Sequence, residues 1–83
     1  MQDVRAYEKA FGARLKAARK NKQLRQVDLA ALVYVSPNEV LNWEGGKRMP
    51  PLRTVCELAK LLDVSAGWLV AGEGKNEDRD PED

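Results

Sequence analysis

Apolar residues recur along most of this 83-residue chain at intervals of three and four positions, the spacing that gathers side chains on one face of an α-helix. No stretch alternates between apolar and polar residues with period two, which is the pattern of a half-buried β-strand. Helices are therefore expected at 3–20, where Asp3 can act as the N-cap, and at 26–33, 36–44, 52–62 and 65–71. The pattern predicts an all-α fold in which five helices form one compact core.

The segment 36–44 carries the clearest start signal. Ser36 can cap the helix, Pro37 suits its first position, and Glu39 is spaced to complete a capping box by accepting from the Ser36 amide. Val35 and Val40 are spaced to form a hydrophobic staple. A helix this short is not stable alone, so neighbours must hold its apolar side and its other side is free for recognition.

The last two helices and the end of the chain set the domain boundary. Ser65 can cap the helix at 65–71, and Gly72 ends it. Residues 73–83 contain no apolar residue that could be buried, so we expect one domain over 1–72 and a disordered acidic tail over 73–83. The core is expected to include Leu52, Val55, Leu58, Ala59 and Leu62 on one face of the helix at 52–62, together with Phe11, Trp43, Cys56 and Trp68.

Charge and composition narrow the function. The formal net charge of +1 is the sum of +5 for residues 1–72 and −4 for residues 73–83, and a basic body is compatible with an anionic partner. The chain has no histidine and one cysteine, so we expect no zinc site, no cofactor and no catalysis by a nucleophile–histidine pair. It also lacks a signal pattern and a long apolar run, which favours a soluble protein. Because it has no histidine, no paired carboxylate cleft and no phosphate loop, we expect no enzyme.

Residues 11–72 resemble the lambda-repressor/Cro type of helix-turn-helix domain, also called the XRE family. The resemblance covers about three-quarters of the chain, with the family's spacing kept throughout. The residues that carry it are Phe11, Arg14, Leu15, Lys16, Ala18, Arg19, Leu24, Gln26, Leu29, Ala30, Val35, Ser36, Val40, Trp43, Glu44, Gly46, Lys47, Pro50, Leu58, Ala59, Leu62, Val64, Ser65, Trp68, Leu69 and Gly72.

The resemblance implies that the third helix enters the major groove of double-stranded DNA, in a homodimer bound to a pseudo-palindromic operator. It implies a sequence-specific transcriptional regulator that occludes a promoter in the cytoplasm of a bacterial or phage-infected cell. The base-reading positions it assigns are Pro37, Asn38, Glu39, Leu41 and Asn42. The positions it assigns to the DNA backbone, through side chains and through the amides of 45–48, are Arg25, Gln26, Gly45, Gly46, Lys47, Arg48 and Arg53. Arg19 and Glu44 match a pair that forms a salt bridge behind the recognition surface.

The base-reading positions each have a simpler alternative. Asn38 and Asn42 have the chemistry to pair with adenine, but they could be solvated polar positions. Glu39 could accept from cytosine N4, or it could bond the Ser36 amide as part of the capping box, which we favour. Leu41 could contact a thymine methyl group, or it could pack sideways onto the small core.

Several positions depart from the pattern of the family. Tyr34 stands where the turn usually has glycine; a bulky residue at positive φ is strained, so a turn of different shape is expected. Arg25 replaces the usual serine or threonine cap of the second helix, which removes about 1 kcal/mol of capping and adds a cation near the DNA backbone. Pro37 replaces a position that often reads bases, and Asp63 replaces the glycine after the fourth helix.

A second function stays open at this point. The domain could be an antitoxin-type interaction module whose main partner is a protein, either a toxin or an antirepressor, with DNA binding secondary or absent. An exposed apolar surface on the first helix, formed by Val4 and Tyr7, would serve such a partner. A toxin-like reading frame next to the gene would favour this alternative.

Overall fold

The computed structural model describes residues 4–73, and all regular secondary structure in this range is helical. The helices are α1 (Val4–Asn21), α2 (Gln26–Leu32), α3 (Pro37–Glu44), α4 (Leu52–Leu62) and α5 (Ala66–Ala71). These bounds confirm the five predicted helices, each to within one residue at either end. The proposed N-cap Asp3 and the predicted tail beyond Glu73 lie outside the described residues.

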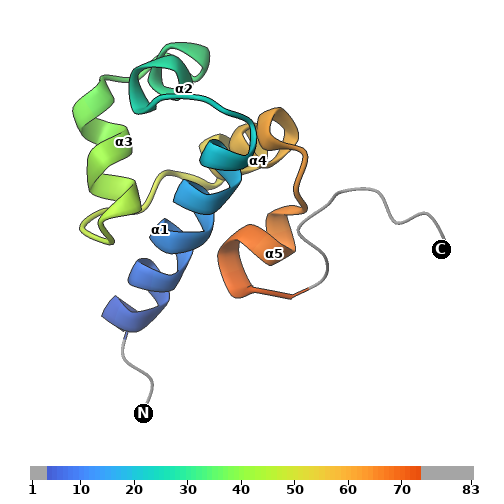
Figure 1. Cartoon of the computed structure of the whole chain (residues 1–83). Coiled ribbons are helices and arrows are strands. Elements are labelled where there is room, and N and C mark those ends of the chain that lie inside the picture. The colour runs from blue at the N-terminus through green and yellow to red at the C-terminus, as the bar shows by residue number, and fades with distance from the viewer. Residues whose placement is uncertain (1–3, 74–83) are drawn as a thin grey trace, which may run out of the picture.

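The longest helix, α1, runs through the middle of the molecule, with α2 and α3 on one side of it and α5 on the other (Figure 1). Helix α3 packs against both α1 and α2, while α5 packs against α1 and α4. The buried core lies between these helices and holds Phe11, Leu15, Ala18, Leu29, Ala30, Val33, Val40, Trp43, Val55, Leu58, Ala59, Leu62, Val64 and Leu69.

The crossing of α1 and α3 depends on Gly12. This residue is buried, and a β-carbon built on it would stand 2.5 Å from the carbonyl oxygens of both Trp43 and Glu44. No side chain fits in this space, so the two helix backbones approach each other more closely than side chains would allow. Glycine in the interior of a helix lowers helix stability by about 1 kcal/mol relative to alanine. The close packing of α1 against α3 is the structural reason for a glycine at position 12.

Each helix is followed by a residue in the left-handed backbone conformation. After the first four helices, the next amide donates to the carbonyl five residues earlier. In α1, for example, the Leu24 amide donates to the Arg19 carbonyl at 3.2 Å across such a turn. Glycine occupies only two of these positions. Within residues 4–73, the residues with positive φ are Gln23, Tyr34, Gly46, Asp63 and Gly72.

Arg14 attaches α5 to α1. Its guanidinium donates from Nε to the Leu69 carbonyl at 3.0 Å and from Nη2 to the Val70 carbonyl at 2.9 Å. Carbonyls in the last turn of a helix have no partner within the helix, so a cation placed there satisfies them and favours the helix dipole. A six-residue helix is thereby fixed in place by a residue that lies 55 positions earlier in the chain.

Two core predictions for α4 are wrong. Leu52 is 76% exposed, because it is the first residue of α4 and extends beyond the core that Val55 and Leu62 enter. Cys56 is also exposed. Successive residues of a helix are rotated by about 100° around its axis, so Cys56 points away from the core that Val55 enters. The buried face of α4 is therefore one turn shorter than its apolar pattern suggested.

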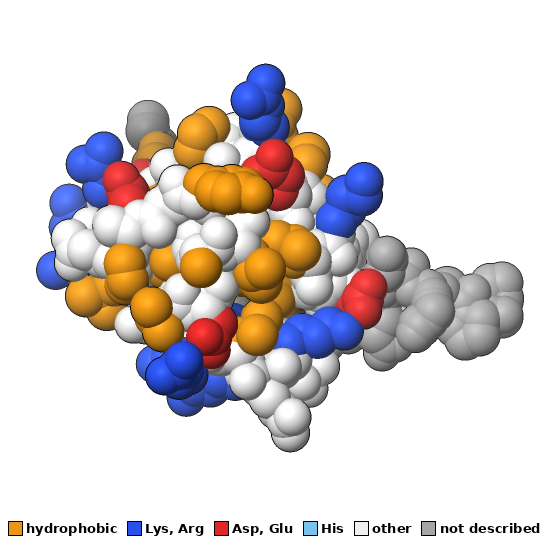
Figure 2. Space-filling view, turned by 90° about the horizontal axis from the view of Figure 1, so that it is seen from above, with side chains coloured by type: hydrophobic (Ala, Val, Ile, Leu, Met, Phe, Trp, Pro, Cys, Tyr) orange, Lys and Arg blue, Asp and Glu red, His pale blue; other side chains and the backbone are white. Residues whose placement is uncertain are grey.

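The surface near α2 carries exposed apolar side chains. Figure 2 looks onto the side where α2 lies and shows hydrophobic side chains across the middle of the face, with Lys and Arg around its edge. Val27 and Leu32 of α2 are 45% and 48% exposed. None of the helices within residues 4–73 is long and apolar enough to cross a membrane.

Candidate nucleic-acid interface

Helix α3 begins as its sequence predicted. Ser36 has an extended backbone, and its hydroxyl oxygen accepts a hydrogen bond from the Glu39 amide at 3.3 Å. Pro37 occupies the first helical position, where the missing N–H costs nothing. Val40 and Trp43 are buried, at 0% and 3% exposure. These contacts fix one side of α3 to the core and leave the other side to solvent.

The predicted capping box forms only in part. Within residues 4–73 the Ser36 amide makes no hydrogen bond to the Glu39 carboxylate, so the reciprocal bond that we favoured is wrong. The Ser36 hydroxyl alone caps the helix. The half-buried Glu39 side chain therefore keeps its acceptor oxygens for another partner.

The solvent side of α3 combines amide and aliphatic side chains. Pro37, Asn38 and Leu41 are exposed, and Asn42 is half-buried. Leu41 is 52% exposed, which contradicts the alternative that it packs sideways onto the core. Together with Glu39, these residues are the five positions that the family resemblance assigned to base reading, and all of them lie on one short helix.

The turn between α2 and α3 keeps the glycine-type conformation although its residue is tyrosine. Tyr34 has φ of 61°, and its side chain is 94% exposed. The Tyr34 and Val35 amides donate to the carbonyls of Ala31 and Ala30 at 3.4 and 3.0 Å, the bonds that close such a turn. The expected change of shape is therefore wrong, since these bonds hold the backbone and the exposed ring meets no obstacle.

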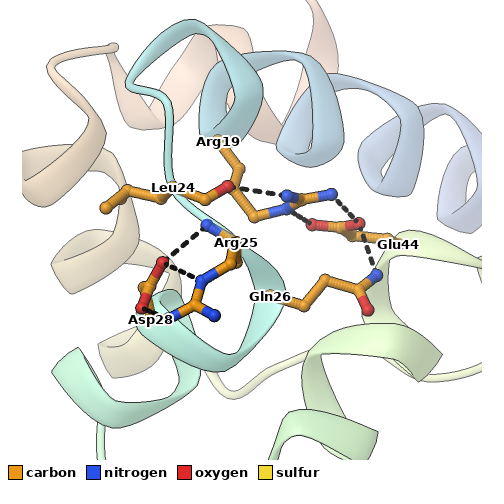
Figure 3. Close-up of polar contacts among 6 residues, drawn as sticks. All are labelled: Arg19, Leu24, Arg25, Gln26, Asp28 and Glu44. Atoms are coloured by element: carbon orange, nitrogen blue, oxygen red, sulfur yellow. Dashed lines mark hydrogen bonds and ion pairs between the residues drawn. The ribbon is translucent and has the colours of Figure 1, made fainter.

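A polar network connects α1, α2 and α3 behind the exposed side of α3 (Figure 3). Arg19 donates from Nε to Glu44 Oε2 at 2.6 Å and from Nη2 to Glu44 Oε1 at 3.1 Å. Its Nη1 donates to the Leu24 carbonyl at 2.8 Å. Gln26, the first residue of α2, donates from Nε2 to Glu44 Oε1 at 3.0 Å. The end of α3 is thereby joined to the start of α2 and to α1.

The Arg19–Glu44 pair is the predicted structural ion pair, and it is well buried. The two side chains are 8% and 3% exposed. Within residues 4–73, no buried side-chain nitrogen or oxygen lacks a hydrogen-bond partner. The pair therefore meets the condition under which a buried charge is tolerated, and it fixes the position of α3 rather than offering a site for a ligand.

The start of α2 is capped in a way that the sequence analysis missed. Asp28 Oδ2 accepts from the Arg25 amide at 2.8 Å and from Arg25 Nε at 3.1 Å, and Asp28 Oδ1 accepts from Arg25 Nη2 at 3.1 Å. The hydrogen bond from the Arg25 side chain, with that from its amide, lowers the pKa of Asp28. The expected loss of capping is thus compensated by Asp28, and the acidic residue at the third helical position was the available signal.

The loop after α3 uses its amides within the molecule. The amides of Gly45 and Gly46 donate to the Leu41 and Trp43 carbonyls at 2.9 and 3.2 Å. Those of residues 47 and 48 donate to the Asn42 carbonyl at 2.9 and 3.4 Å. These four amides are not available to phosphate, which corrects that part of the prediction. The charges of the loop lie on the exposed side chains of Lys47 and Arg48, and Arg53 is exposed in the first turn of α4.

Comparisons with known proteins identify the kind of domain that residues 12–75 form. A family model described as "Helix-turn-helix domain" matches residues 12–75. The chain is 33% identical over 71 residues to the HTH-type transcriptional regulator DicA of Escherichia coli K12, which covers 86% of this chain and 50% of DicA. It spans between about a quarter and about half of the length of the curated relatives it matches.

Solved structures with this fold include the following two. The restriction-modification controller protein C.AhdI of Aeromonas hydrophila superposes with a TM-score of 0.74 at 34% identity, covering 82% of this chain and 99% of that protein. The P22 c2 repressor, solved in complex with a synthetic operator, gives 0.72 at 32% identity and covers 76% and 96%. The chain belongs to the helix-turn-helix domain family of the XRE type, a family of DNA-binding transcriptional regulators and not a class of enzymes.

Proposed function

We propose that this protein is a sequence-specific transcriptional regulator that inserts α3 into the major groove of a pseudo-palindromic operator as a homodimer. The observation that supports this most is the division of α3 into two sides. One side is held by Val40, Trp43 and the buried Glu44, and the other presents Asn38 and Leu41 to solvent. A helix fixed in this way can present side chains to base edges without losing much conformational freedom on binding.

Base readout is assigned to the exposed side of α3. Asn38 and Asn42 pair with adenine through its N7 and N6 atoms, a contact that contributes about 1–3 kcal/mol of discrimination when it is bidentate. Leu41 contacts a thymine methyl group, because about half of its surface is left exposed in the free domain. Glu39 accepts from cytosine N4, and Pro37 packs at the groove edge.

Backbone contacts are assigned to the cations on either side of α3. Lys47 and Arg48 follow its end, and Arg53 begins α4. Gln26 is positioned at the start of α2 by its bond to Glu44, so its amide group is held next to the end of α3. Arg25 exchanges part of its bond to Asp28 for a phosphate, since the Arg25 side chain is 79% exposed and a phosphate is an anionic acceptor like the Asp28 carboxylate.

Similarity to DicA and to an operator-bound repressor supports this proposal, because both are named as regulators or repressors. The DNA-binding unit is residues 1–72, and repression follows if the bound homodimer occludes a promoter. A DNA ligand implies action in the cytoplasm of a bacterial or phage-infected cell.

The experiment that tests the proposal is selection of binding sites from a random pool of duplex DNA at near-physiological salt, which suppresses sequence-blind binding. Enrichment of a twofold-symmetric site, with half-sites about one helical turn apart, is the expected result. Absence of any enriched site with folded protein would contradict it. A toxin or an antirepressor would then be the next partner to test, at exposed Val4 and Tyr7 of α1.

A further inference from the structure

An open pocket of about 290 Å³ lies between the first turns of α1 and the loop that follows α3. Its lining brings together two segments that are distant in the sequence. The base-reading side of α3 contributes nothing to this lining, so the pocket is separate from it. The residues that line it are Arg5, Glu8, Lys9, Gly45, Gly46 and Lys47.

The pocket exists because α1 packs directly onto the backbone of Gly46. A β-carbon built on Gly46 would stand 2.8 Å from Cγ of Lys9 and 2.9 Å from its Cα. Gly46 also has φ of 76°, so a side chain is disfavoured by its conformation as well as by space. The stem of Lys9 therefore crosses the loop just before Lys47, and the two lysines line one pocket from different elements.

The charge of the lining favours an anion. Lys9 and Lys47 are exposed, and they outnumber the one carboxylate of the lining, that of Glu8. The loop amides donate to carbonyls of α3, so an anion here must be bound by side chains. Lysine ammonium groups bind phosphate oxygens as point charges and need no fixed geometry to do so.

We infer that this pocket binds one phosphate group of the DNA backbone, with Lys9 and Lys47 as its ligands and Arg5 at its edge. The inference rests on the proposed function, and it adds α1 to the DNA-binding surface. The first turns of α1 thus extend the row of cations that begins with Lys47 and Arg48. This contact carries no sequence information, since a phosphate is common to all base pairs.

The test compares Lys9→Gln with a matched control, Lys60→Gln. Lys60 is an exposed lysine in the last turn of α4, and it does not line the pocket. Binding of the selected duplex and of a random duplex is measured against salt concentration. Loss of one phosphate contact should lower the slope of log K against log salt by about one unit for Lys9→Gln on both duplexes, and not for Lys60→Gln.

The outcomes separate the inference from the proposed function. Wild-type protein that binds no duplex contradicts the proposed function itself. Wild-type protein that binds DNA while Lys9→Gln keeps the wild-type slope overturns the phosphate site alone. A titration with inorganic phosphate, followed through the NMR signal of the Gly46 amide, distinguishes the source of the anion. If Lys9→Gln abolishes binding of free phosphate but leaves the salt slope of DNA binding unchanged, the pocket binds a free anion and the inference is overturned.

Discussion

Gly12 of α1 lies against the backbone of Trp43 in α3, so closely that a β-carbon on Gly12 would stand 2.5 Å from the Trp43 carbonyl oxygen. This contact sets how deeply the recognition helix sits against the domain. Gly12→Ala should lower the free energy of unfolding by about 2 kcal/mol, because the cost of overpacking exceeds the gain of about 1 kcal/mol in helix propensity. Urea denaturation measures the change.

Gly67→Ala is the matched control, since Gly67 also lies within a helix. Within residues 4–73, a β-carbon there meets only the Glu73 carbonyl oxygen, at 3.7 Å, which is an ordinary contact. This variant should be neutral or stabilised by up to about 1 kcal/mol. If alanine changed the free energy of unfolding equally at Gly12 and Gly67, the close α1–α3 crossing would not be the cause of the loss at Gly12.

Glu44→Gln tests the buried network. The change leaves the Arg19 guanidinium buried without a counter-charge, at an expected cost of about 3–5 kcal/mol in the free energy of unfolding. Asp63→Asn removes one partner of the Lys22–Asp63 pair, whose side chains are 38% and 67% exposed, and should cost about 0–1 kcal/mol. Similar losses for the two variants would mean that burial does not decide the contribution of these pairs.

The positive φ of Tyr34 predicts a stabilising substitution. Tyr34→Gly should raise the free energy of unfolding by about 0.5–1 kcal/mol, because it relieves left-handed strain of about 1–2 kcal/mol and the gain exceeds the entropy cost of glycine. Tyr34→Ala keeps a β-carbon and should give no such gain. Tyr34 is 94% exposed, so neither variant loses packing. If thermal unfolding showed the alanine variant to be as stable as the glycine variant, the assignment of backbone strain to Tyr34 would be contradicted.

The lowered pKa of Asp28 predicts that the free energy of unfolding depends on pH. The hydrogen bond from the Arg25 side chain lowers the pKa of Asp28 from its ordinary value of 3.8, so the ionised form stabilises the folded state above that value. This contribution should be lost as the pH falls below about 4 and through the lowered pKa. Denaturation from about pH 7 to about pH 3 should therefore show wild type losing more stability than Asp28→Asn. If the free energies of unfolding of wild type and Asp28→Asn changed in parallel with pH, the Arg25–Asp28 pair would contribute nothing to the pH dependence of stability.

Most of the fold could be predicted from the sequence because the signals are local. Helical periodicity, the Ser36 and Ser65 caps and the glycines that end α3 and α5 act within a few residues, and the helices form where they indicated. The Arg19–Glu44 pair came from the family resemblance, since nothing in a spacing of 25 residues brings the two side chains together.

The predictions from the sequence that were wrong or missing concern contacts that depend on how the helices pack against one another. Leu52 fits the periodicity of α4, but the core ends before it. Gly12 and Arg14 became informative only once α3 and α5 lay beside α1. The amides of the loop after α3 were expected to face phosphate, and their use by α3 could not be deduced without the geometry of its last turn.

The central claim is that α3 reads sequence while the cations beside it supply affinity. The most direct test measures Asn38→Ala and Lys47→Ala on the selected operator and on duplexes with single base substitutions. Asn38→Ala should relax preference at one base step by about 1–3 kcal/mol, whereas Lys47→Ala should weaken all duplexes alike and lower the salt slope by about one unit. Loss of affinity in the same sequence-blind manner for both variants would contradict the claim.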